Sequence, residues 1–133
     1  MLVTIEKVLL LKQMAPFKSV SNMALSDLMA VSEEQTLKPG TCLIEPTEPN
    51  RKIYFLLSGA VEVCRQDKKE NVSSKAVLGL ASAFWTGSAD EQVVVTQKSV
   101  VLVVAHDNLY RVMALHPSLA FAVLNELSAL AHQ

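Results

Sequence analysis

Two apolar segments meet at a single Ser58-Gly59 step in the stretch IYFLLSGAVEV, which runs from Ile53 to Val63. The first segment, Ile53 to Leu57, contains only aromatic, branched or long apolar residues, and this composition favours a buried strand. After Gly59 the residues alternate, as they do in a half-exposed strand. Glycine takes a positive φ without steric cost, so the chain can turn tightly between the two strands. The stretch therefore predicts a β-hairpin in a β-rich core.

The size and charge of the chain restrict its class. Its 133 residues suit one domain with one core, and a hydrophobic content of 50% with 19% charged residues is typical of a packed protein. A net charge of −1 gives no attraction toward nucleic acid or an anionic membrane. The sequence has no run long enough to cross a bilayer and no evident signal peptide. We expect a cytoplasmic protein, or the cytoplasmic domain of a larger one, with no nucleic-acid partner and no direct membrane insertion.

Residue types that serve catalysis or metal binding are poorly placed in this sequence. The spacing of Cys42 and Cys64 matches no metal site, and both residues read as small buried hydrophobes. His106, His116 and His132 lie at or beyond the last predicted strand, so none falls where a metal-dependent β-roll enzyme needs its ligands. No Ser, His and acid pattern and no Gly-rich phosphate loop stands out. We therefore expect no enzymatic activity, no catalytic residue, no metal and no cofactor.

The spacing of apolar residues changes twice along the chain. It is helical over residues 4–12 and from Ser21 onward, then extended with about eight short strands, then helical again with Pro117 as the first residue of the last helix. This order predicts a mostly β fold, a small barrel or jelly roll with flanking helices. We predict one domain over residues 1–133, with N-terminal helices over 1–34, a β-roll over 35–105 and C-terminal helices over 106–133.

The last predicted helix, residues 118–131, is apolar around most of its circumference. Glu126 is its only residue with a fixed charge. A helix that is apolar on so many sides needs more than one neighbour. We expect it to pack on the β-roll and also on a further surface, which is either a neighbouring domain or a second copy of the chain in a homodimer.

Several segments, taken in order, resemble the cyclic-nucleotide-binding domain family, also called cAMP-binding domain-like. Ile53–Val63 is the best match. Leu11–Phe17 resembles the leading helix and turn, and Leu37–Thr41 resembles the first strand turn. His106–Tyr110 and Leu115–Pro117 resemble the helix start and the step before the final helix. The resemblance implies an eight-stranded β-roll, of the jelly-roll or double-stranded β-helix type, that holds a cyclic nucleotide and carries C-terminal hinge and lid helices.

The resemblance also places the family's phosphate-binding cassette at residues 83–93. The family pattern is Phe-Gly-Glu, a few apolar residues, and then an Arg followed by small residues and Val. Here Phe84 fits, Trp85 stands where the Gly would be, and Thr86 stands where the Glu would be. Asp90, or a residue near it, replaces the Arg. The ligand-binding residues implied by this degenerate cassette are Phe84, Trp85, Thr86, Gly87, Ser88 and Asp90.

These replacements change the function that the resemblance implies. A carboxylate facing a phosphodiester repels it, and Trp85 would fill space that close backbone approach requires. All three arginines, Arg51, Arg65 and Arg111, lie outside the cassette. We therefore predict a regulatory or interaction module that has lost binding of cyclic AMP and cyclic GMP. The alternative is a ligand-sensing domain that binds a cyclic nucleotide or another small molecule in the β-roll, under Phe84 and Trp85.

Overall fold

Residues 2–85 and 87–131 are described by the structure, which is a computed structural model. Its eight strands are β1 (Glu33–Leu37), β2 (Cys42–Ile44), β3 (Lys52–Ser58), β4 (Ala60–Arg65), β5 (Lys68–Ser73), β6 (Ala76–Leu78), β7 (Gln92–Val95) and β8 (Ser99–Ala105). They form two four-stranded antiparallel sheets with the orders β1-β8-β3-β6 and β2-β7-β4-β5. The predicted eight-stranded β-roll is thereby confirmed for the described residues.

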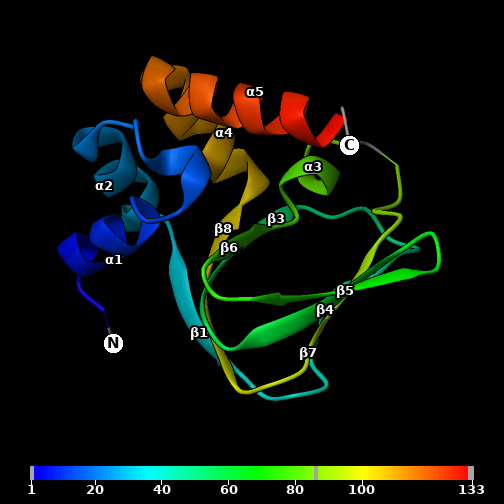
Figure 1. The fold of residues 1–133 in the computed structure, drawn as a ribbon. Helices are drawn as coiled ribbons and strands as arrows, with labels where there is room; N and C mark the ends of the chain where they lie inside the picture. Colours follow the sequence, from blue (N-terminus) through cyan, green and yellow to red (C-terminus); the bar gives the residue numbers. More distant parts are fainter. Residues whose placement is uncertain (1, 86, 132–133) are drawn as a thin grey trace.

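The helices gather at one end of this roll (Figure 1). They are α1 (Thr4–Leu11), the 3-10 turn η1 (Ala15–Phe17), α2 (Asn22–Ala30), α3 (Leu80–Ala83), α4 (His106–Leu115) and α5 (Pro117–Ala131). Figure 1 shows α5 lying across the top of the molecule, above α3 and beside α4. Pro117 begins α5, as predicted. Within the described residues, none of these helices combines the length and the apolar character that a membrane span requires.

The predicted hairpin at Ile53–Val63 is wrong, because β3 and β4 belong to different sheets. β3 pairs with β8 and β6, whereas β4 pairs with β7 and β5. Gly59 turns the corner between the sheets with φ +98°, and a Cβ on it would lie 2.1 Å from Ser99 Oγ. Five consecutive residues of β3 are buried because both faces of the strand are covered. One face meets the helices and the other meets the opposite sheet.

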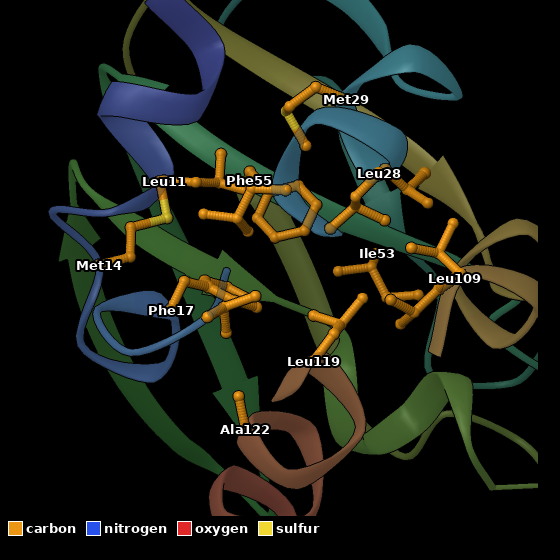
Figure 2. Packing of buried hydrophobic residues seen from close by; sticks show 14 of the residues in the cluster. Leu11, Met14, Phe17, Leu28, Met29, Ile53, Phe55, Leu109, Leu119 and Ala122 are labelled. Atoms are coloured by element: carbon orange, nitrogen blue, oxygen red, sulfur yellow. The ribbon is translucent and has the colours of Figure 1, made fainter. Parts of the chain in front are cut away.

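Alternate residues of β3 contribute to two hydrophobic clusters. Ile53, Phe55 and Leu57 join the cluster under the helices, whereas Tyr54 and Leu56 join the cluster between the sheets. Figure 2 shows the first of these clusters, with residues of the helices surrounding the two labelled β3 side chains. The Phe17 and Phe55 rings meet edge to face with centroids 5.7 Å apart. This packing holds the helices against one face of the sheet that contains β3.

Candidate functional site

The segment that carries the predicted cassette connects β6 to β7 and begins with the short helix α3. The helix ends at Phe84, whose N–H donates to the carbonyl of Ala81 at 3.2 Å. The Phe84 ring lies partly buried against the imidazole of His106, with centroids 4.8 Å apart in an edge-to-face arrangement. Phe84 therefore points toward the start of α4.

Trp85 lies on the surface, not under the roll. Its side chain is 62% exposed and lines a hollow that is open to solvent. Its indole stands close to Gly87, since a Cβ on that glycine would lie 2.6 Å from Trp85 Nε1. Ser88 is exposed, and Thr86 lies outside the described residues. Phe84 and Trp85 are neighbours in sequence but face different parts of the molecule.

The backbone N–H groups near the position of the family's arginine donate hydrogen bonds to carbonyl groups of this protein. The N–H of Ala89 donates to Glu48 O at 2.8 Å, and the N–H of Asp90 donates to Pro46 O at 3.2 Å. Asp90 is exposed and has φ +60°. The loop between β2 and β3 thus occupies the N–H groups that could otherwise receive an anion.

A cavity of about 120 Å³ lies between β4, β5, β6, α3 and α5. Apolar side chains such as Val63, Leu78 and Leu130 form part of its wall. Its charged lining consists of one cation and three carboxylates, which belong to Arg65, Glu70, Glu91 and Glu126. Pockets for drug-sized ligands usually measure roughly 300–1,000 Å³, so this cavity is small for a nucleotide.

The cation of this cavity is held by a neighbouring carboxylate. Arg65 Nε donates to Glu91 Oε2 at 2.9 Å, and the Glu91 side chain is only 7% exposed. It is the only ion pair between an Arg or Lys and a carboxylate that the described residues contain. Neither Arg65 nor Glu91 is among the ligand-binding residues predicted from the sequence. A signal was present for Arg65, because strand alternation places it on the same face as the buried Val61 and Val63.

A second hollow, of about 320 Å³ and open to solvent, is lined in part by the same ion pair. Trp85 and Asp90 are the only predicted site residues among the described ones that line it. They share it with Arg65, Glu91 and Leu130. The structure therefore divides the predicted site, and it brings two of its residues to an arginine that comes from another strand.

Residues suited to metal binding or redox chemistry are dispersed. Across residues 2–85 and 87–131, no three His, Cys, Asp or Glu side chains come close enough to hold a metal ion. Both cysteines are free, and burial raises the pKa of Cys42, with a further contribution from Glu45. A raised pKa lowers the thiolate fraction, which is the reactive form.

Comparison with solved structures shows the same architecture in other proteins. The sensor domain of the transcriptional regulator DNR from Pseudomonas aeruginosa is similar with a TM-score of 0.82 and 25% identity, over 98% of this chain and 91% of that chain. A cyclic nucleotide-binding domain from Methylobacillus flagellatus gives a TM-score of 0.77 and 18% identity, over 97% and 78%. The catabolite activator protein of Thermus thermophilus gives a TM-score of 0.77 and 12% identity. The match covers 88% of this chain and 58% of that chain, so the chain spans little more than half of that regulator.

Sequence comparison places the chain in a family. No curated protein matches it. The family described as cyclic nucleotide-binding domain matches residues 34–116, which cover β2 to β8 and α4 in full and all but the first residue of β1. Together with the eight-stranded roll and its flanking helices, this match establishes that the chain belongs to the cyclic nucleotide-binding domain family.

Proposed function

We propose that this domain is a non-catalytic regulatory or interaction module that does not bind cyclic AMP or cyclic GMP. The observation that carries the proposal is the state of the cassette. Residues 80–92 contain no Lys or Arg, and the N–H groups of Ala89 and Asp90 bond to Glu48 and Pro46. A phosphodiester placed there would lack the charge-assisted hydrogen bonds that such anions need.

The charges around the cavity support the same conclusion. Glu70, Glu91 and Glu126 outnumber Arg65, so a phosphate entering the cavity would meet a wall of net negative charge. Arg65 already donates to Glu91, and a nucleotide would have to displace that carboxylate. Like charges brought together at a binding site cost several kcal/mol. The similarity to the sensor domain of a transcriptional regulator supports a regulatory role.

We also propose that the exposed side of α5 contacts a second copy of the chain. Leu119 and Val123 face the helical core, whereas Phe121 and Leu124 are large apolar residues on the exposed side. Exposed apolar groups of this kind on a helix favour association. A neighbouring domain is the other partner compatible with this surface. The cytoplasmic location stays a prediction from the sequence.

The experiment is a titration of the purified chain with cyclic AMP and with cyclic GMP, read by fluorescence and by calorimetry. Trp85 is the only tryptophan, and it lines the hollow next to Arg65. A flat response up to millimolar nucleotide is expected, with a nucleotide-binding member of the family as the positive control. Saturable binding at micromolar concentration would overturn the proposal. It would instead favour the ligand-sensing alternative, whose support in the structure is the open hollow of about 320 Å³.

A further inference from the structure

Two cations face each other across the end of the β4–β5 hairpin. Arg65 is directly opposite Lys68 in the strand register, and side chains at opposite positions project from the same face of a sheet. That face is the inner one, since Val63 precedes Arg65 on it and is buried. Like charges at directly opposite positions are destabilising. An anion close by would relieve this repulsion.

Glu91 supplies part of the negative charge. Its carboxylate accepts the hydrogen bond from Arg65 Nε at 2.9 Å, and the Glu91 side chain is nine-tenths buried. A guanidinium has five N–H donors, and the other four of Arg65 have no hydrogen bond to a described residue. Four of the five Arg65 donors therefore remain accessible to a ligand, since the side chain is 51% exposed.

Space for an anion lies beside these free donors. A hollow of about 460 Å³ is lined by Arg65, Lys68 and Lys69 together with Glu70. Its charged lining is thus three cations and one carboxylate, opposite in sign to the lining of the inner cavity. The hollow lies at the turn of the β4–β5 hairpin, whereas the cassette lies between β6 and β7.

We propose that Arg65 and Lys68, neither of which belongs to the cassette, form an anion-binding site at the turn of the β4–β5 hairpin, and that Glu91 is an internal anion that weakens this site by neutralising Arg65. The ligand is a small oxyanion with a phosphate or carboxylate group, which binds the Arg65 donors that Glu91 does not use. Glu70, Glu126 and Asp90 line the hollows around Arg65 and oppose a second anion, so the wild-type site is weak while Glu91 holds it. The inference rests on the proposed function, because that proposal leaves the cassette without a cation to hold an anion.

Replacement of the internal anion tests the proposal. Glu91→Gln removes the charge and keeps the shape, and we expect it to bind inorganic phosphate at least about tenfold more tightly than the wild type at constant ionic strength. The gain should disappear when Arg65→Met is added and should fall when Lys68→Met is added. A parallel titration with succinate distinguishes a carboxylate ligand from a phosphate ligand. Equal affinities of Glu91→Gln and wild type for both anions would overturn the proposal.

Glu62→Gln is the matched control, because it changes the net charge of the chain by the same amount as Glu91→Gln. Glu62 lies on β4 with Arg65, but on the opposite face of the strand. If Glu62→Gln gained as much phosphate affinity as Glu91→Gln, the gain would come from the overall charge of the chain. That result would also overturn the proposal. Circular dichroism checks the fold of each variant.

A second measurement uses the wild type and does not depend on the folding of the variants. The ¹⁵N resonance of Arg65 Nε should stay unchanged at low millimolar phosphate, because Glu91 holds this donor. A saturable shift at such concentrations would show that Glu91 does not weaken the site. Binding of cyclic AMP by the wild type would overturn the proposed function, whereas failure of Glu91→Gln to gain phosphate affinity would overturn only the anion site.

Discussion

His116 and Asp27 share a hydrogen bond of 2.7 Å between Nε2 and Oδ2, although they lie 89 positions apart in the sequence. His116 lies at the junction of α4 and α5, and Asp27 lies on α2. The contact is reinforced nearby, where the N–H of Ser21 donates to Ser118 Oγ at 3.3 Å. The N-terminal helices and the C-terminal helices are therefore joined at the point where α5 begins.

Loss of this contact should loosen the junction. Asp27→Ala removes the carboxylate that accepts from His116, and we expect the free energy of unfolding to fall by about 0.5–1 kcal/mol, since Asp27 is half-exposed. Amide exchange at residues 116–120 should become faster. Asp107→Ala is the control, because Asp107 also contacts a histidine, at 3.3 Å, but is 88% exposed. Asp107 also lies in the first turn of α4, so amide exchange at residues 116–120 is the deciding readout. Equally fast exchange there in the two variants would contradict the structural role of the Asp27 contact.

Gly59 should be the most sensitive glycine of the roll. Gly59→Ala forces a non-glycine residue to φ +98° and places a Cβ 2.1 Å from Ser99 Oγ and 2.7 Å from Lys98 O. The conformational and steric costs together predict a loss of about 3 kcal/mol in the free energy of unfolding. Gly40→Ala has a similar φ of +92° with no atom within 4 Å, so it should lose only about 1 kcal/mol. Denaturant unfolding of both variants measures the difference, and equal losses would show that the corner is not crowded.

The order of helices and strands was predictable because it depends on local spacing. The change from helical to extended spacing near β1, the apolar run of β3 and Pro117 at the start of α5 are all local signals. The sheet partners of β3 and β4 were not predictable in the same way. A glycine between two strands fits a hairpin and a corner between sheets equally well, and the choice depends on β8 and β7, which come much later in the chain.

The candidate site was predicted less well for a related reason. The family pattern directed attention to the segment around Trp85 and Asp90, whereas the cation of the site, Arg65, comes from β4. Its partner Glu91 lies 26 positions away in sequence, and only the folded roll brings the two together. Alternation along β4 could have indicated that Arg65 faces inward, but not which carboxylate it meets.

Tyr54 should make the stability of the fold sensitive to alkaline pH. Burial, with a smaller contribution from Cys42, raises the pKa of Tyr54 above its ordinary value, and its hydroxyl donates to Leu43 O at 3.1 Å. A raised folded pKa means that the stabilisation is fully present below the unfolded value of about 10 and is lost as the pH rises through the folded pKa. Tyr54→Phe should cost about 1 kcal/mol at pH 7 and show a smaller further loss between about pH 9 and 11. Urea unfolding at several pH values measures both effects, and parallel curves for variant and wild type would contradict the assignment. Tyr110→Phe, at an exposed position, is the control.

The exposed side of α5 provides the test of self-association. Phe121 is 67% exposed, and its replacement by Glu adds a charge where a second copy would pack without disturbing the buried Leu119 and Val123. We expect Phe121→Glu to remain folded and to shift the chain from dimer to monomer at concentrations where the wild type is dimeric, because an unpaired charge in an apolar interface is costly. Ile5→Glu is the matched control, since Ile5 is 68% exposed on α1 and receives the same new charge. Sedimentation velocity over a range of concentrations measures both variants. A wild type that stays monomeric at high concentration would rule out the second copy and leave a neighbouring domain as the partner for this surface, whereas dissociation by Ile5→Glu to the same extent would place the interface elsewhere.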